Sequence, residues 1–224
     1  MGKQNTMSPV KRRFMLQAAL SLGLPATLVA PWARAADQDP NAFIQNLSNE
    51  ILSLIHSDKA VQNGNVARIR ELVDSKIMPN VNFTRMTASA VGPAWRQATP
   101  EQKQQLEKQF ETLLIRTYAG ALNQVKNQTV DVQPFRGNPN DNDVVVRTLV
   151  KGSGEPIQLD YRLERTPGKG GGWKIYDLNV IGVWLVANYR SQFAEQVNRG
   201  GIPGLIKSLQ EHNAADAAAD KKNS

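Results

Sequence analysis

The sequence predicts an α+β fold, in which several helices pack against a bent four-stranded antiparallel sheet. Apolar residues recur every three or four positions before residue 126 and after residue 184, which is typical of helices with one apolar side. Between residues 129 and 180 they alternate with polar residues, as in strands. The loops between these strand-like runs have about 6–9 residues, too few for the crossover that parallel neighbours require.

Residues 1–35 have the features of an export signal. A basic segment, Lys11-Arg12-Arg13, precedes an apolar run at residues 19–30, and Ala33-Arg34-Ala35 matches the small-residue pattern of a cleavage site. The apolar run is short and interrupted by a proline, which makes it a poor membrane span. We therefore expect an exported protein that is cleaved after Ala35, with the Sec and Tat routes both open.

Removal of this segment changes the charge of the protein. The whole chain has a formal net charge of +7, but the 189 residues after Ala35 contain 22 basic and 20 acidic side chains. This balance gives no electrostatic support for nucleic-acid binding. The chain has no cysteine, which excludes disulfides and thiolate metal sites, and its two histidines, His56 and His212, are too far apart for a helical metal motif.

The first part of the mature chain is predicted to be helical. One amphipathic helix spans residues 40–55, and a second follows Asn63-Gly64-Asn65 and ends before Pro79. A short helix over residues 82–91 begins near Asn82 or Thr84.

The clearest helix begins at residue 100. Thr99 and Gln102 form a capping box around Pro100, which suits the first helical position. The apolar residues that follow keep helical spacing for about seven turns. This helix therefore offers one broad apolar face to the rest of the protein.

The sheet is predicted from four alternating segments. These segments are residues 129–135, 144–150, 157–164 and 173–180. In the last segment the alternation slips, because Trp173 and Ile175 fall on one face and Leu178 and Val180 fall on the other. Either a bulge changes the face at this point, or both faces of the strand are covered.

An unusually apolar junction, around Gly182, connects the last strand to the C-terminal helices. The helix after Trp184 stops at Arg199-Gly200-Gly201, and a short helix follows from residue 203 to 209. Residues 213–224 contain no large apolar side chain and are predicted to be a disordered tail. The chain therefore divides into a signal peptide (1–35), one domain (36–212) and a tail (213–224).

The sequence gives little support for an enzyme. A Ser–His–Asp arrangement needs a base with an orienting acid, and neither histidine has a convincing set of partners. Asp177 is the most interesting carboxyl group, since it precedes the apolar junction. It could act with a tyrosine in an exported enzyme, or it could be a structural carboxylate that caps backbone N–H groups or pairs with an arginine such as Arg190. The structural reading is favoured, and no enzyme activity or cofactor is expected.

Two blocks of the sequence resemble the MlaC family, also called the toluene-tolerance auxiliary family. The C-terminal signature of the family resembles residues 171–213, which include GGWKIYDLNVIGVWLVANYRSQF. Its upstream block resembles residues 78–122. That block has a proline, an aromatic residue, and the patterns W-R, T-x-x-Q and Y-A in this order. Two positions depart from the family pattern: Asn82, where the family often has Asp, and Trp184, where it often has Ser. A bulky Trp184 would reshape whatever lies beside the junction.

The resemblance implies a periplasmic phospholipid carrier that maintains the lipid asymmetry of the outer membrane. Family members move lipid between an outer-membrane complex of MlaA with a porin and the MlaD ring of an inner-membrane ABC transporter. By this resemblance, an apolar cavity lies between the sheet and the helices and holds the acyl chains, with phospholipid as the only bound ligand. A related carrier for hopanoids or other lipids would look similar at this level.

Residues that would line such a cavity are those on the inward apolar faces. We predict the following set: Phe83, Met86, Trp95, Leu114, Tyr118, Val146, Leu159, Tyr161, Leu178, Val180, Val183, Leu185 and Tyr189.

Overall fold

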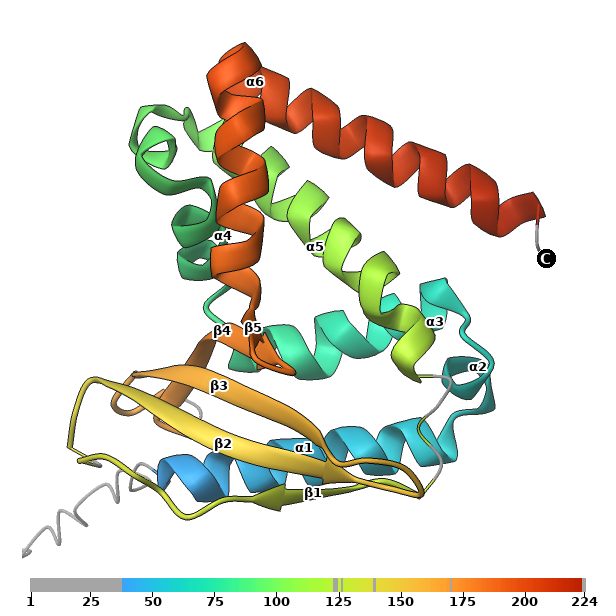
Figure 1. Cartoon of the computed structure of the whole chain (residues 1–224), viewed down its shortest axis with the longest axis vertical. Coiled ribbons are helices and arrows are strands. Elements are labelled where there is room, and N and C mark those ends of the chain that lie inside the picture. Colours follow the sequence, from blue (N-terminus) through green and yellow to red (C-terminus); the bar gives the residue numbers. More distant parts are fainter. Residues whose placement is uncertain (1–37, 123–124, 126, 139, 170, 223–224) are drawn as a thin grey trace, which may run out of the picture. The chain divides into compact units, whose positions relative to one another are not determined.

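The computed structural model describes residues 38–122, 125, 127–138, 140–169 and 171–222 (Figure 1). The predicted signal peptide, residues 1–35, lies outside the described residues. The helices are α1 (Pro40–Ser57), α2 (Lys59–Gln62), α3 (Val66–Leu72), η1 (Val73–Ile77), η2 (Met78–Asn80), α4 (Phe83–Val91), η3 (Gly92–Gln97), α5 (Pro100–Leu122) and α6 (Leu185–Lys222). The strands are β1 (Thr129–Val132), β2 (Asp143–Lys151), β3 (Ile157–Arg165), β4 (Trp173–Val180) and β5 (Val183–Trp184).

The helices begin where short polar side chains cap them. Asp39 accepts hydrogen bonds from two backbone N–H groups at the start of α1, and Asn82 accepts one from Arg85 at the start of α4. Thr99 and Gln102 bond to each other's backbone N–H groups, which confirms the predicted capping box of α5. Between α3 and α4, the chain passes through a π-helical turn, η1, and a 3₁₀ turn, η2, that contains Pro79.

The sheet is an antiparallel meander in the order β1-β2-β3-β4-β5, which confirms the predicted α+β class and the antiparallel pairing. It has five strands rather than the four predicted. The additional strand, β5, has two residues that pair with the end of β4 across the turn at Ile181-Gly182. So short a strand leaves no alternation in the sequence from which it could be predicted.

The C-terminal helix α6 has two arms (Figure 1). Gly200 and Gly201 have non-helical backbone angles, as the predicted helix stop requires. The second arm, however, continues to Lys222, across most of the segment that was predicted to be a disordered tail. Asn213 in this arm is buried, and its amide nitrogen donates to the carbonyl of Gln109 on α5 at 3.0 Å. Alanine-rich segments have a high helix propensity even when they lack an apolar face, which explains the difference.

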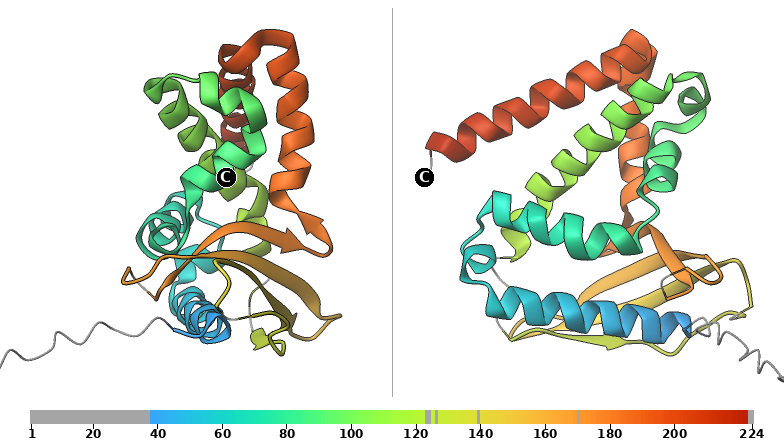
Figure 2. Two further views of the ribbon diagram at one scale, coloured as in Figure 1. Left: turned by 90° about the vertical axis from the view of Figure 1, so that its left-hand side faces the viewer. Right: turned by 180° about the vertical axis from the view of Figure 1, so that it is seen from behind.

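Helices cover the sheet in two groups. Figure 2 shows α1 running along the strands, while α4, α5 and α6 stand together at the end where β4 and β5 meet α6. The cross-strand partners Val144–Leu163 and Leu163–Ile175 share one face of the sheet, and this face packs against α1. The predicted arrangement of helices against one face of the sheet is therefore present.

Candidate functional site

A β-bulge divides β4 into two halves. Leu163 of β3 pairs with Ile175, but the preceding residue, Arg162, pairs with Asp177, so that Tyr176 is an extra residue in β4. The bulge returns Leu178 to the face that carries Ile175, although the two are an odd number of positions apart. Of the two alternatives that the sequence left open, the structure has the bulge.

The half of β4 before the bulge belongs to a compact cluster with α1. Trp173 is 1% exposed, Ile175 and Leu163 are also buried, and Phe43 and Ile44 of α1 pack on them. The indole Nε1 of Trp173 donates to the backbone carbonyl of Gln38 at 2.8 Å. This half of the strand is ordinary protein core.

The half after the bulge contacts a second cluster, built by α4, α5 and α6. At its centre is Phe110 of α5, which is fully buried. The Phe110 ring lies 5.7 Å from that of Phe83, 5.0 Å from that of Tyr189 and 5.2 Å from that of Phe193. Such offset and edge-on contacts fix the three helices to one another. Leu178 and Val180 pack against this cluster but remain half-buried.

A third cluster joins α1, α2, α3 and α5. Its buried members include Ile55, Val61, Ile69 and Ile115. The described core is therefore split into three clusters, whereas a domain usually has one contiguous core with smaller satellites. Large apolar side chains at the borders of these clusters are only partly buried. Examples are Leu47, Ile51, Val73, Ile77, Leu114, Tyr118, Tyr161, Leu178, Val180 and Val186.

The thirteen predicted cavity residues fall into three groups. Nine belong to the cluster of α4, α5 and α6 or pack against it: Phe83, Met86, Trp95, Leu114, Tyr118, Leu178, Val180, Leu185 and Tyr189. Val146 and Tyr161 belong to the cluster with α1. The remaining two, Leu159 and Val183, belong to none of the clusters, and Val183 is 52% exposed. The structure brings most of the set together, and contact with a ligand stays a prediction.

Three of these side chains are tyrosines, of which Tyr189 is buried and Tyr118 and Tyr161 are half-buried. Burial raises the pKa of Tyr118, Tyr161 and Tyr189 above the ordinary value. The Tyr161 hydroxyl bonds to Thr148 and to Ser48 of α1, so that its polar end is satisfied within the sheet–α1 layer. These tyrosines therefore stay neutral and present mostly apolar surface.

Asp177 clamps the junction between β4 and α6. One carboxylate oxygen accepts hydrogen bonds from the backbone N–H groups of Leu178 and Val186, at 2.9 and 3.0 Å. The other accepts from Arg162 at 2.9 Å, and the Arg162 guanidinium lies 3.9 Å from the centre of the Trp184 ring. Asp177 is 1% exposed, and burial raises its pKa although Val186 N–H and Arg162 oppose the shift.

These contacts match a structural carboxylate, although the partner differs from the predicted example. The arginine is Arg162, whereas Arg190 donates to the backbone carbonyl of Ser89 at 2.9 Å. Trp184, which departs from the family pattern, completes the clamp, because the Arg162 guanidinium lies over its ring. Sequence spacing alone could not pair Arg162 with Asp177, because the bulge sets the register.

The second departure from the family pattern, Asn82, has a related explanation. Its side-chain oxygen caps α4, and its amide nitrogen donates to Glu164 on β3. Arg85 contacts the same carboxylate at 2.6 Å and Asp143 at 2.7 Å. An aspartate at position 82 could cap the helix but would bring a third negative charge beside Glu164 and Asp143. The asparagine thus joins α4 to the sheet without that repulsion.

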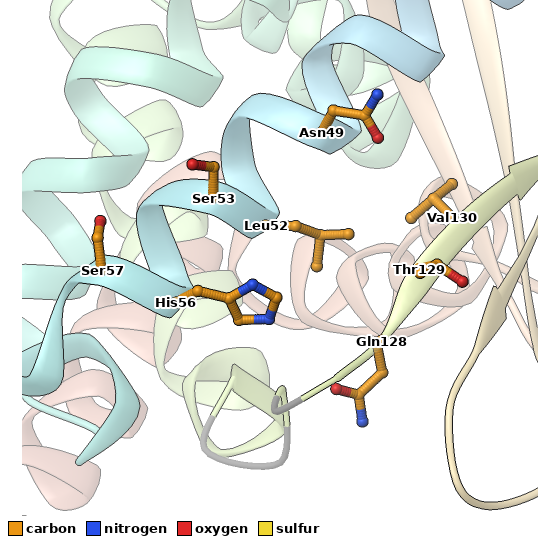
Figure 3. A pocket seen from close by; sticks show the side chains of 8 residues that line it. All are labelled: Asn49, Leu52, Ser53, His56, Ser57, Gln128, Thr129 and Val130. Carbon is orange, nitrogen blue, oxygen red and sulfur yellow. The ribbon is translucent and has the colours of Figure 1, made fainter.

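A pocket of about 480 Å³ lies elsewhere, between α1 and the start of β1. Figure 3 shows Leu52 and His56 of α1 pointing toward Thr129 and Val130. None of the thirteen predicted residues lines it. Its eight lining residues include a single histidine and no carboxylate, which is not a set that could orient a catalytic base.

The described residues contain no group of three or more His, Cys, Asp or Glu side chains that could hold a metal ion. None of the helices in the described ranges combines the length and apolar character that a bilayer crossing needs.

Comparison with known proteins decides the family. The family model described as MlaC protein matches residues 45–211, which is most of the chain. The chain belongs to the MlaC family. This match confirms the resemblance that the two sequence blocks indicated, and it covers the bulge, the Asp177 clamp and the three apolar clusters except Phe43 and Ile44.

Two curated relatives of this MlaC-family chain have informative names. One is the intermembrane phospholipid transport system binding protein MlaC of Haemophilus influenzae, which is 25% identical over 193 residues, or 86% of this chain and 90% of its own. The other is the toluene tolerance protein ttg2D of Pseudomonas putida, which is 27% identical over 184 residues, or 81% of this chain and 84% of its own.

A solved structure resembles the chain more strongly. It is the phospholipid-binding protein of Ralstonia solanacearum in complex with a phospholipid. The two chains share 47% identity and superpose with a TM-score of 0.77, over 80% of this chain and 99% of the other.

Proposed function

We propose that this MlaC-family protein is a periplasmic phospholipid carrier. The observation that carries the proposal is the likeness to the Ralstonia solanacearum protein, which matches almost along its whole length and was solved with a phospholipid. The relative from Haemophilus influenzae, named as part of a phospholipid transport system, supports the same function.

The split core of this chain supports lipid binding independently. Half-buried apolar side chains on three clusters would gain burial if acyl chains lay between them, as the predicted cavity requires. A lipid that enters water exposes its tails at about 0.8 kcal/mol per CH₂, so a sixteen-carbon chain costs on the order of 12 kcal/mol. A protein that replaces this contact with water removes most of that barrier to movement between membranes.

We further propose that the protein shuttles lipid between an outer-membrane complex of MlaA with a porin and the MlaD ring of an inner-membrane ABC transporter. The sequence contains no phosphate-binding loop with which to use ATP. The direction of transport would therefore come from these partners. Export by the segment of residues 1–35 would bring the chain to the periplasm, where both partners are accessible.

The lipid contacts can be tested with matched charged substitutions. Val180→Asp and Leu159→Asp place a carboxylate on the inner face after the bulge, where acyl chains are proposed to lie. Val145, which pairs with Arg162, lies on the opposite face of the sheet and supplies the control Val145→Asp. We expect native mass spectrometry to detect bound phospholipid in the wild type and in Val145→Asp, and several-fold less in the other two variants.

Several results would contradict the proposal. Repeated purification without lipid, together with no uptake from phospholipid vesicles, would exclude a lipid carrier. Full lipid occupancy in folded Val180→Asp and Leu159→Asp would instead make these positions ordinary core. Extraction and identification of the bound lipid would distinguish a phospholipid from a hopanoid or another lipid.

A further inference from the structure

The exposed large apolar side chains of the described residues are gathered at one corner of the sheet. They are Ile157, Ile181 and Val183, which are 44%, 69% and 52% exposed. Ile157 begins β3, and the other two lie in the β4–β5 hairpin, at the foot of the first arm of α6 in Figure 1. The N–H of Ile181 donates to the carbonyl of Gln158 at 3.0 Å, which holds the hairpin beside the start of β3.

The backbone of this hairpin is unfavourable for the residue at its tip. Ile181 has φ 51° and Gly182 has φ 85°, and among the described residues Ile181 is the one non-glycine residue with positive φ. Two-residue hairpins with positive φ at both positions normally use Asn, Asp or Gly. A β-branched residue is a true outlier there, and such strain is often associated with function. The exposed isoleucine is therefore not the residue that the turn alone would favour.

The hairpin is nevertheless held firmly by its polar groups. Asn179 accepts a hydrogen bond from the N–H of Gly182 at 2.8 Å, and Asp177 holds the chain on both sides of the turn through Leu178 and Val186. Asp177 and Asn179 are buried on one face of β4, and the apolar residues lie on the other. The exposure of Ile181 and Val183 thus comes from a well-bonded turn and not from a loose loop.

The exposed side chains continue an apolar row that leads to the helical cluster. Tyr161 pairs with Leu178, Leu159 pairs with Val180, and Val180 pairs with Val183. Along this face, Leu178 and Val180 are half-buried against the cluster of α4, α5 and α6, whereas Val183 is half-exposed. Apolar and aromatic side chains of β3, β4 and β5 therefore follow one another on this face, from that cluster to the exposed Val183.

We propose that the β4–β5 hairpin is the portal through which acyl chains enter and leave the lipid site. Ile181, Val183 and Ile157 would contact the chain while it is between the membrane and the interior. This inference rests on the proposed function, since it assigns the entrance of the same site. Contact with apolar side chains in transit reduces the hydrocarbon exposed to water and so speeds transfer in both directions.

The test separates transfer rate from lipid capacity. Ile181→Asn removes the apolar tip and supplies a residue that tolerates positive φ, so it should fold at least as stably as the wild type. Val183→Ser removes the neighbouring apolar side chain. Ile181→Leu and Val183→Leu are the matched controls, because they keep the apolar character at each position.

The measurement is transfer of a phospholipid with a pyrene-labelled acyl chain from vesicles of phosphatidylethanolamine and phosphatidylglycerol. We expect uptake and release to be slowed about tenfold in Ile181→Asn and Val183→Ser, equivalent to the loss of one well-buried apolar contact in the transition state. The leucine variants should transfer at close to the wild-type rate, and Ile181→Asn should reach the same final lipid occupancy as the wild type.

Each other outcome has a distinct meaning. If the wild type takes up no lipid, the proposed function itself fails. If the wild type loads but both polar variants transfer at its rate, the portal is wrong and the carrier stands. A loss of final occupancy in Ile181→Asn would place the hairpin tip in the storage site and overturn the portal. A rate loss accompanied by lost sedimentation with vesicles would make the hairpin a membrane-docking element, which also overturns the portal.

Discussion

The two halves of β4 have opposite characters although they belong to one strand of eight residues. Before the bulge, Trp173 and Ile175 are buried among side chains of α1 and the neighbouring strands. After it, Leu178 and Val180 are half-buried, and the buried positions are occupied by the polar residues Asp177 and Asn179. A single extra residue thus separates a part of the strand that stabilises the fold from a part that leaves apolar surface available.

This difference indicates how one sheet can serve both stability and ligand binding. The first half excludes water by close packing, as an ordinary core does. The second half is held by hydrogen bonds of Asp177 and Asn179 on one face. Its opposite face, which carries Leu178 and Val180, therefore does not need to be filled by protein. The following predictions test whether this division is real.

The largest effect is expected in the first half. Trp173→Ala removes a fully buried indole and its hydrogen bond to Gln38, and should lower the free energy of unfolding by about 4 kcal/mol. Val180→Ala in the second half should cost less than about 1 kcal/mol, because this side chain is only half-buried. Urea unfolding of lipid-free protein measures both. If Trp173→Ala does not fold, Trp173→Phe supplies a milder comparison. Equal losses of unfolding free energy in the two halves would contradict the division.

Removal of lipid should affect the second half selectively. A ligand present at a hundred times its dissociation constant stabilises the folded state by about 3 kcal/mol. Hydrogen exchange of lipid-loaded and lipid-free protein should therefore show loss of protection at Leu178–Val186 and little local change at Trp173–Ile175. Uniform loss of protection along β4 would mean that lipid stabilises the whole strand alike.

The clamp that orders the second half can be weakened directly. Asp177→Asn removes the charge that pairs with Arg162 and should lower the free energy of unfolding by about 2 kcal/mol, while bound lipid is retained in the folded fraction. Glu195→Gln, which removes an exposed ion pair with Arg199, is the control and should have little effect. Loss of a hydrolytic or isomerising activity in folded Asp177→Asn would instead revive the enzyme hypothesis.

The smallest effect concerns the third cluster, away from β4. Burial and the nearby carboxylate of Asp74 raise the pKa of Glu111 on α5 to about 7. The folded protein therefore binds the proton of Glu111 more tightly than the unfolded chain does. The stability that comes from this proton is lost as the pH rises through about 7. Glu111→Gln should therefore be more stable than the wild type at pH 8, by no more than about 1 kcal/mol for this half-buried group, and no different near pH 4.5.

Thermal unfolding at the two pH values measures this difference, and Asp74→Asn tests its cause. Without the neighbouring carboxylate, the wild-type pH dependence should become smaller. A stability difference for Glu111→Gln that is the same at pH 4.5 and pH 8 would show that packing, and not ionisation, is responsible.

Much of the fold could be predicted because local signals agree with it. The capping box at Thr99, the N-cap at Asn82 and the glycine pair at 200–201 each act within a few residues. The helix at residues 213–222 was missed because the prediction relied on apolar periodicity, whereas this alanine-rich segment is helical through its propensity alone. Strand β5 was missed because two residues are too few to show alternation of apolar and polar residues. The bulge could only be left as an alternative, since register depends on both strands.

The candidate site was less accessible to sequence reasoning. Inward positions could be recognised, and nine of the thirteen predicted residues meet at one cluster. Burial alone does not separate a ligand contact from core, however, and the aromatic group around Phe110 includes Phe83 and Tyr189 in tight packing. The exposed tip at Ile181 was missed as a site residue, although an isoleucine directly before a glycine in a predicted turn is a signal that could have indicated it.

The two edges of the sheet also have a consequence for self-association. An exposed edge strand offers unpaired backbone groups to another chain and promotes aggregation. Here one edge strand, β5, has only two residues. The other edge strand, β1, is covered by α1, because the side chain of Gln45 donates a hydrogen bond to the carbonyl of Val130 at 3.1 Å. Just beyond this strand, the side chain of Asn41 donates to the carbonyl of Gln133 at 3.0 Å. A protein that keeps apolar surface open thus offers little backbone for a second copy to extend its sheet.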